Sequence, residues 1–440
     1  MPLPLILGTN AVTGGYDVAN SCRFDDGSST QMNKTISSTS TTWTFSCWIK
    51  HTPTNLNQYL ISWDLSGGES LGIGIERTSQ STQLFIYNSA TGQAPKLYDG
   101  KLRDPSAWYN IVIKNSSGTI TSYINGTQAN TSITGTALAS GTLRVGCWTA
   151  GNYFYNGYMS EVVLIDGTAY DADSFGEFDS NSPNIWKPID VSGLTFGSDG
   201  FYLDFEDSSN LGNDANGGTD LTEANLTATD QSTDTCTNNF ATLNPLANLT
   251  GSPTFSEGNL KVAGDNSANH NWQTTFVVSS GKWYWELKDL TSSPDGSLLF
   301  YDQSISSGSH PGYGFVLNTK KKVIGGSVTG SAIGSSAQND IWSMALDLDN
   351  GKMFIARNGT YLESGDPANG TNPFIQTSDG LPSEGVFGGH VYNGSMELNF
   401  GSPSFTISSG NADANGYGNF EYAVPSGYFS LCTKNLAEYG

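Results

Sequence analysis

The chain has 440 residues, of which 37% are hydrophobic and only 14% are charged. This length suits two domains, and the 52 glycines favour turns and strands over helices. The net charge of −22 argues against a nucleic-acid partner and against anionic membranes, because phosphate groups are bound by clusters of Lys and Arg.

The first half of the chain predicts short antiparallel strands. Apolar side chains stand at Trp43, Phe45, Cys47 and Ile49, and this period of two is typical of a half-buried strand. Further strand-like segments follow at short intervals, separated by turn residues, at 84–87, 108–113, 122–124, 143–148 and 159–165. Strands at this spacing, without helical stretches, predict a β-sandwich or jelly roll.

The middle of the chain, 188–246, is rich in Asp, Asn, Gly and Thr. The one clear strand within it, 200–205, contains aromatic residues, which favour an ordered connection over a free linker. Strands then resume, with Trp283, Trp285 and Leu287 alternating with polar residues. Later strand segments end at turns that carry the Asn-Gly hairpin signal, Asp349-Asn350-Gly351 and Asn358-Gly359.

We therefore expect an all-β chain with two antiparallel β-sandwich (jelly-roll) domains in tandem. The expected boundaries are 1–187 for the first sandwich, 188–246 for the connection and 247–440 for the second sandwich. Five cysteines, far apart and odd in number, do not form a disulfide framework, and we expect them to fill the cores.

The first half resembles the laminin-G-like, concanavalin A-like lectin domain over about residues 15–175. The resemblance rests on blocks that occur in order, namely SCRFD at 21–25, TFSCWIK at 44–50, WYNIV at 108–112, YING at 123–126 and YNGYMSEV at 155–162. It implies a lectin jelly roll.

The second half resembles a SPRY domain, a β-sandwich used for recognition. The matching blocks are GKWYWE at 281–286, GYGF at 312–315, WSMALDLD at 342–349, RNG at 357–359, LNFG at 398–401 and PSGYFSLCTKNL at 425–436. Both halves are thus similar to binding scaffolds, although a fold alone does not fix a function.

The two domains together, with MPL at 1–3 and FYLDFED at 201–207, resemble tail-fibre-like or other surface virion proteins of marine bacteriophages. The resemblance implies a non-enzymatic fibre or spike component at the virion surface, with host cell-surface glycans and other virion proteins as partners. Segment 1–7 lacks the basic region and apolar length of a signal peptide, and no window predicts a membrane span. The composition is nevertheless of an extracellular type. Release of a virus particle by lysis would reconcile the missing signal peptide with that composition.

Fibre proteins present several copies of a weak site, so we expect a homo-oligomer, with a trimer favoured, organised by the apolar segment 3–7. Two alternatives stay open. The first is an architectural capsid decoration or adaptor protein without a glycan ligand. The second is a secreted bacterial protein that acts on glycans.

No catalytic residue is predicted. Glucanases of the concanavalin A-like fold use a Glu-x-Asp-x-x-Glu motif, and a retaining mechanism needs two carboxyl groups about 5 Å apart. The nearest match has Glu177 and Asp179, but Ser182 replaces the third acid. The G-x-S-x-G pattern at 68–72 leads into a strand and not into a helix, so it is no nucleophile elbow.

The best candidate for glycan binding is the segment after the strand at 143–148, because sugars stack on aromatic rings that loops present beside polar groups. Its candidate residues are Trp148, Asn152, Tyr153 and Tyr155. In the alternative, which stays open, Trp148 and one of the tyrosines face the core. The candidates in the second half are Tyr301, His310 and Tyr313.

The sequence requires no cofactor. Calcium is bound by oxygen ligands, and the acidic pairs that could supply them are Asp25 with Asp26 and Asp204 with Asp207. The alternative is that these four carboxylates are solvated loop residues.

Overall fold

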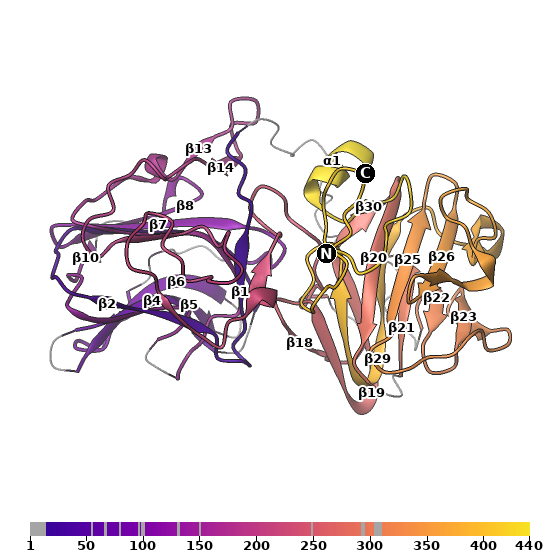
Figure 1. Ribbon diagram of the computed structural model, residues 1–440. Coiled ribbons are helices and arrows are strands. Elements are labelled where there is room, and N and C mark those ends of the chain that lie inside the picture. Colours follow the sequence, from indigo (N-terminus) through magenta and orange to yellow (C-terminus); the bar gives the residue numbers. More distant parts are fainter. Residues whose placement is uncertain are drawn as a thin grey trace. The chain divides into compact units, whose positions relative to one another are not determined.

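A computed structural model describes residues 15–53, 56–65, 68–78, 81–95, 97, 102–129, 133–148, 151–247, 250–291, 295–302 and 310–440. The described residues form two compact units, one ending at Thr237 and the other beginning at Asn238, which we call the first and second domains (Figure 1). The expected boundaries at 187 and 246 therefore differ from the observed division, because residues 188–237 belong to the first domain. The apolar segment 3–7 lies outside the described residues.

The first domain contains two antiparallel sheets. The larger has the strand order β10-β8-β7-β3-β12-β1-β17, with β9 beside β8 and β15 beside β12. Its strands are β1 (Ser21–Phe24), β3 (Trp43–His51), β7 (Tyr109–Ser116), β8 (Thr119–Ile124), β9 (Thr127–Gln128), β10 (Ile133–Thr134), β12 (Gly157–Asp166), β15 (Phe201–Leu203) and β17 (Gln231–Ser232).

The second sheet of this domain has the order β16-β2-β11-β4-β5-β6. Its strands are β2 (Gln31–Ile36), β4 (Gln58–Asp64), β5 (Ser70–Thr78), β6 (Ser81–Asn88), β11 (Gly141–Val145) and β16 (Thr222–Ala224). A separate hairpin joins β13 (Gly176–Phe178) to β14 (Trp186–Pro188).

The first core lies between these two sheets. The rings of Trp43 on β3 and Trp63 on β4 meet edge-on with centroids 5.2 Å apart, and Phe45, Cys47 and Ile49 are buried in the same cluster. The expected inward face of this strand is confirmed. Its expected half-exposure is wrong, because every residue of β3 is buried.

Segment 188–237, together with residues just before it such as Ala172 and Phe175, packs on the outer face of the larger sheet. Val112, Val163 and Ile165 pack there against Phe196 and Tyr202. The segment also adds strands, since β15 pairs with β12, β16 with β2 and β17 with β1. It is an integral layer of the first domain and not a connection between domains.

The second domain is built around a ladder with the order β24-β23-β22-β21-β29-β20-β25-β26-β27, to which β18, β19, β28 and β30 add. Its strands are β18 (Thr254–Ser256), β19 (Lys261–Val278), β20 (Lys282–Asp289), β21 (Asp295–Tyr301), β22 (Tyr313–Val316), β23 (Lys321–Ile324), β24 (Ser327–Thr329), β25 (Ile341–Asp347), β26 (Lys352–Arg357), β27 (Thr360–Tyr361), β28 (Ile375–Gln376), β29 (Gly385–Asn399) and β30 (Phe429–Ser430).

The long strand β29 belongs to both halves of this ladder. Its first part pairs with β21 and its last residues pair with β20, while β19 runs along most of its length (Figure 1). Trp283, Trp285 and Leu287 on β20 are buried in the enclosed core, as the alternation predicts. The chain is thus all-β with antiparallel sheets, as expected, and its one parallel pair among the described strands is β20 with β30.

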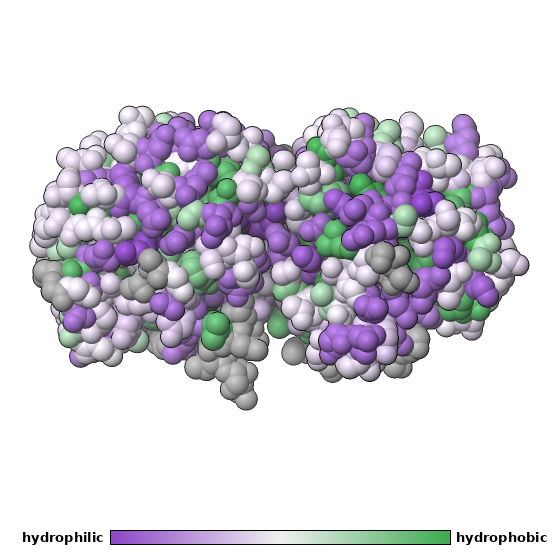
Figure 2. Space-filling view, turned by 60° about the horizontal axis from the view of Figure 1, so that its bottom comes forward, coloured by the Kyte–Doolittle hydropathy of each residue, from purple (hydrophilic) through white to green (hydrophobic). Residues whose placement is uncertain are grey.

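Helices are few. Among the described residues, the α-helix α1 spans Thr433–Tyr439, and four single turns of 3₁₀-helix lie at Ala172–Ser174, Ala228–Asp230, Leu362–Ser364 and Thr377–Asp379. None of the helices in the described ranges is long and apolar enough to cross a membrane. On the face shown in Figure 2, hydrophobic residues form small separate groups among polar ones.

All five cysteines are free thiols, and four of them are buried. Burial raises the pKa of each thiol above its ordinary value, to about 12 for Cys147 and about 11 for Cys432. The expectation that cysteines fill the cores is confirmed for Cys22 and Cys47.

Candidate functional site

Five aromatic side chains gather on the outer face of β4, β5 and β6 in the first domain, the face turned away from the core. We call them the aromatic cluster: Tyr59, Phe85, Tyr87, Trp148 and Tyr153. The ring centroid of Tyr59 lies 4.7 Å from that of Trp148, 5.4 Å from Phe85 and 6.1 Å from Tyr153. The Tyr87 ring lies 5.3 Å from Trp148.

Two glycines on the central strand β5 make this gathering possible. Leu71, Ile73 and Ile75 point into the core, so Gly72 and Gly74 face outward. Gly74 stands between Tyr59 and Phe85 on the flanking strands, and Gly72 stands beside Tyr87.

The rings lie directly on the backbone at these glycines. A Cβ atom at Gly72 would come within 2.7 Å of the Trp148 ring and 2.6 Å of the Tyr59 ring. At Gly74 it would lie 3.1 Å from the Phe85 ring. The two glycines therefore leave a stretch of bare backbone, which we call the glycine track, and aromatic rings pack against it.

A short loop after β11 delivers Trp148 to this track. The Ser62 hydroxyl donates to the carbonyls of Cys147, at 2.9 Å, and Trp148. The Trp148 amide donates to the Asn152 carbonyl at 3.1 Å. These bonds fix the backbone on both sides of the indole.

The cluster has a buried base and an exposed rim. Tyr59 and Phe85 are only 4% and 2% exposed, whereas Tyr153 is 47% exposed, and Trp148 and Tyr87 are half-buried. Burial, together with the phenols of Tyr87 and Tyr153, raises the pKa of Tyr59. Asn152 is exposed beside the rim, so stacking surface and an amide are available together.

Tyr155 does not belong to this surface. It is fully buried in the core, its hydroxyl donates to the Tyr158 carbonyl at 3.2 Å, and its ring packs edge-on against Phe24. The reason is the backbone of Tyr153, whose φ of 53° breaks the extended geometry, so residues two apart no longer share a face. The prediction of Tyr155 as a glycan ligand is corrected accordingly.

The acidic pairs shape turns. Asp25 accepts from the Ser28 amide and Asp207 from the Ser209 amide, and Asp204 accepts from the Glu206 amide. Asp26 accepts from the Asn156 side chain at 2.7 Å, and burial together with Asp25 raises its pKa. Within the described part of the chain, no three acidic, His or Cys side chains are grouped to hold a metal.

The second-domain candidates do not converge. Tyr301 is fully buried and donates to the Trp272 carbonyl at 2.9 Å. The ladder partner of Tyr313 is Phe300, so Tyr301, one residue later on β21, points to the opposite face. Tyr301 is thus a core residue, which corrects the prediction, and Tyr313 is half-buried.

His310 packs against the buried His390, with their Nδ1 atoms 3.0 Å apart. His390 also contacts the Ser297 hydroxyl at 2.8 Å and the Asp295 carboxylate at 3.4 Å. Burial and His390 lower the pKa of His310 to about 4, against the opposing effect of Asp295. Ser297 is fully buried, so this network does not offer an accessible nucleophile.

Glu177 and Asp179 lie on and beside the β13–β14 hairpin and share one cation. Lys187 Nζ lies 3.1 Å from Glu177 and 3.5 Å from Asp179. Asp179 also accepts the backbone amides of Asn181 and Ser182 at 2.8 Å, which lowers its pKa. Both carboxylates are used in local structure.

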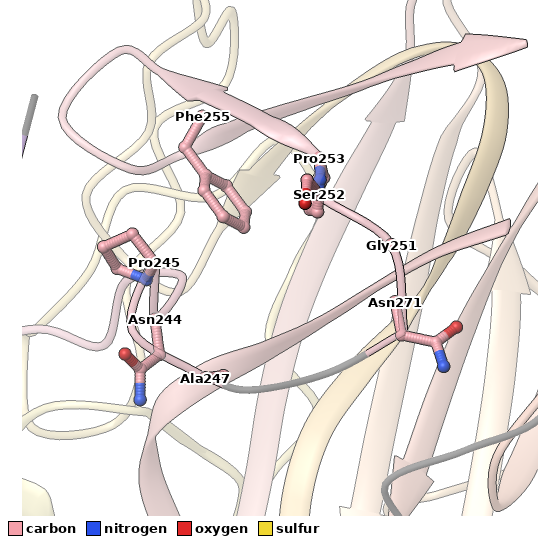
Figure 3. Close-up of a pocket in the computed structure, with 8 residues that line it drawn as sticks. All are labelled: Asn244, Pro245, Ala247, Gly251, Ser252, Pro253, Phe255 and Asn271. Atoms are coloured by element: carbon pink, nitrogen blue, oxygen red, sulfur yellow. The ribbon is translucent and has the colours of Figure 1, made fainter. Parts of the chain in front are cut away.

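A cavity of about 260 Å³ lies in the second domain between the loop around Pro245 and the segment that carries Ser252 and Pro253. Figure 3 shows the Phe255 ring turned toward this space, while the carboxamides of Asn244 and Asn271 point away from each other. One ring without convergent polar groups makes this cavity a weaker candidate than the aromatic cluster.

Sequence reasoning missed Tyr59, Phe85 and Tyr87. The sequence signal for these residues is the alternation of glycines 72 and 74 with apolar residues, near strands that carry aromatic side chains. This signal was insufficient by itself, because the strand register that places the rings over the glycines is known only from the structure.

Comparisons with known proteins give partial matches. No curated protein sequence matches the chain. Among solved structures, the SPRY domain of human HERC1 is similar at 11% identity, covering 36% of this chain and 96% of that one with a TM-score of 0.30.

A heptameric SAP-like pentraxin from Limulus polyphemus is similar at 15% identity, covering 36% of this chain and 80% of that one with a TM-score of 0.28. Tailspike protein 2 of Escherichia coli O157:H7 bacteriophage CAB120 is similar at 16% identity, covering 38% of this chain and 25% of that one with a TM-score of 0.29. Residues 24–173 match the family described as the concanavalin A-like lectin/glucanases superfamily. These residues hold most of the first domain's two sheets. This part of the chain has the concanavalin A-like fold.

Proposed function

We propose that this protein binds carbohydrate without catalysis, through the aromatic cluster of its first domain. The observation that carries the proposal is the arrangement of Trp148, Tyr87 and Tyr153 at the rim of a two-ring base over Gly72 and Gly74. Sugars present flat C–H faces that stack on such rings, and a nearby amide such as Asn152 supplies hydrogen bonds.

The exposure of the rim supports binding over packing alone. A ring that served only the fold would be covered, as Tyr155 is, yet Tyr153 keeps 47% of its surface in contact with solvent. The buried base holds the rim rings in place before a ligand arrives, and this preorganisation reduces the entropy lost on binding.

We further propose that the protein is a surface component of a bacteriophage particle and that its ligand is an envelope glycan of the host cell. The ordered residue blocks of both domains support this assignment, and the acidic, polar surface suits a protein exposed to the medium. An oligomer, with a trimer favoured, would multiply weak sites and raise apparent affinity. Light scattering on the full chain tests this point, and a monomeric mass would count against it.

The binding proposal is tested with the full chain on an array of bacterial envelope polysaccharides. We expect Trp148→Ala and Tyr153→Ala to lose most of the signal. Phe178→Ala is the matched control, since Phe178 is 46% exposed on the β13–β14 hairpin and lies outside the cluster. Equal signals from all four proteins would refute the aromatic cluster as the site.

The role at the virion surface is tested separately, by adsorption of the purified protein to host cells with purified host polysaccharide as competitor. Competition by the polysaccharide supports a receptor-binding role. Presence in virions without any adsorption would favour an architectural protein, and release of reducing sugar would favour a glycan-active one.

A further inference from the structure

A second cavity, of about 240 Å³, opens on the outer face of β20, β25 and β26 in the second domain. Three tyrosines line it, Tyr284, Tyr361 and Tyr422, together with Ser343. Alanine and glycine residues complete the wall. The volume is below the roughly 300–1,000 Å³ of sites for drug-sized ligands, so it suits a single ring.

Local sequence explains why the rings gather. Tyr284 and Ser343 lie on neighbouring antiparallel strands, and the turn Asn358-Gly359 returns the chain so that Tyr361 pairs with Ala356 on β26. Gly359 has a φ of 76°, and a Cβ atom there would lie 2.6 Å from the Tyr422 ring. Glycine therefore permits both the turn and the close approach of Tyr422.

The cavity offers hydroxyl groups for hydrogen bonding. The Tyr284 hydroxyl lies 3.0 Å from both Ser343 Oγ and Glu286 Oε1. Among the described residues, none accepts from or donates to the phenolic oxygens of Tyr361 and Tyr422. The two phenols are therefore available to a ligand, next to aromatic faces. The Ser343 hydroxyl, already bonded to Tyr284, lines the same cavity and can make one further hydrogen bond.

The nearby carboxylate of Glu286 decides between a cationic and a neutral ligand. Glu286 is fully buried and accepts from the Glu421 and Tyr422 amides at 3.0 and 2.8 Å, and from the side chains of Tyr284 and Asn399. Both its oxygens are thus occupied in holding segment 421–422 against the sheet. No charged side chain lines the cavity, which leaves an uncharged ring bearing hydroxyl groups as the ligand that its chemistry fits.

We propose that this cavity is a second carbohydrate site that binds one neutral sugar ring between Tyr361 and Tyr422, with hydrogen bonds to their phenols and to Ser343. It goes beyond the first-domain site and does not depend on it.

The test uses the full chain with Trp148→Ala, which disables the first-domain site. The probes are methyl α- and β-glycosides of glucose, galactose, mannose and N-acetylglucosamine, titrated at millimolar concentrations and followed by saturation-transfer NMR and calorimetry. We expect at least one probe to bind saturably. Adding Tyr422→Ala should weaken the binding of that probe roughly tenfold or more, since a stacking ring is lost.

A second variant separates binding from folding. Tyr361→Phe keeps the ring and removes one hydroxyl, so affinity should fall roughly 3- to 10-fold at an unchanged melting temperature. Tyr392→Phe, on β29 and outside the cavity, is the control and should bind as the parent does. The proposal is overturned if no glycoside binds, if binding is insensitive to Tyr361 and Tyr422, or if tetramethylammonium binds there and the sugars do not.

Failure of the first-domain proposal would look different. It would appear as polysaccharide binding by the full chain that Trp148→Ala leaves unchanged, whatever the glycosides do at the second cavity.

Discussion

The Nζ atom of Lys50 lies 2.7 Å from the Asp234 carboxylate, and only 2% and 1% of the two side chains are exposed. Lys50 is on β3 in the middle of the larger sheet, whereas Asp234 is in the last segment of the first domain. Trp108 adds a hydrogen bond to the other carboxylate oxygen at 3.1 Å. Burial lowers the pKa of Lys50, and Asp234 opposes this effect.

Asp234→Ala should therefore destabilise the first domain severely. Removing the carboxylate nearest to Lys50 leaves its buried charge with much less compensation, and breaking a buried pair in this way costs about 3–5 kcal/mol. The measurement is the free energy of unfolding from urea titration. The double variant Lys50→Met with Asp234→Leu is the control and should lose much less free energy of unfolding. If both variants lose the same amount, lost packing causes the effect and not the buried charge of Lys50.

A chain ending at residue 187 should not fold, whereas one ending at 237 should. Segment 188–237 supplies the carboxylates for three buried cations, through Asp214 with Lys34, Asp230 with Arg23 and Asp234 with Lys50. It also packs on the outer face of the larger sheet. Heat-induced unfolding, monitored by circular dichroism, should be cooperative for the longer chain alone. Cooperative unfolding of both truncated chains would show that segment 188–237 is dispensable for folding.

Tyr153→Ala and Tyr155→Ala should separate binding from stability. Truncating the buried Tyr155 should lower the free energy of unfolding by about 3–5 kcal/mol. Truncating Tyr153, 47% exposed, should change it by less than about 0.5 kcal/mol while weakening carbohydrate binding. A large loss of stability with Tyr153→Ala would mean that its ring serves the fold.

The first domain should become less stable as pH rises from about 5 to 8. Glu161 is buried, and this burial raises its pKa from 4.5 to about 8, while Tyr202 donates to it at 2.8 Å. Between these two values the folded state holds a proton that the unfolded state has released. The stabilisation that comes from the raised pKa of Glu161 is fully present below pH 4.5. It is lost as pH rises through 8, by up to about 1.4 kcal/mol of unfolding free energy per pH unit.

Glu161→Gln is the matched variant, because its amide keeps the shape and can accept from Tyr202 but does not titrate. Urea unfolding of both proteins at pH 5, 6.5 and 8 should show the decline in the parent only. Parallel curves for the two proteins would assign the pH dependence to other groups.

Much of the fold follows from local patterns. Alternation places Trp43 and Trp283 in the cores, and the Asn125-Gly126 and Asn358-Gly359 turns take the positive φ values that their residues favour. Alternation cannot tell whether the other face is also covered, so it predicts a half-exposed β3, whereas every residue of β3 is buried. The cover of its second face includes Trp186, Cys236 and Asp234, which lie far along the chain, and such contacts carry no local signal.

The candidate site was only partly predictable for the same reason. Trp148, Asn152 and Tyr153 are neighbours in the sequence, and their loop could be recognised. Tyr59 and Phe85 join them only through the register of β4, β5 and β6. Tyr155 was misplaced because a left-handed residue at Tyr153 cannot be read from a pattern of alternating side chains.

The free, mostly buried thiols have a practical consequence for how the folded chain responds to reducing agents. No disulfide joins any of the five cysteines, and raised thiol pKa values keep the reactive thiolate scarce at neutral pH. No covalent cross-link is therefore available to a reducing agent in this fold, and treatment with dithiothreitol should leave its melting temperature unchanged.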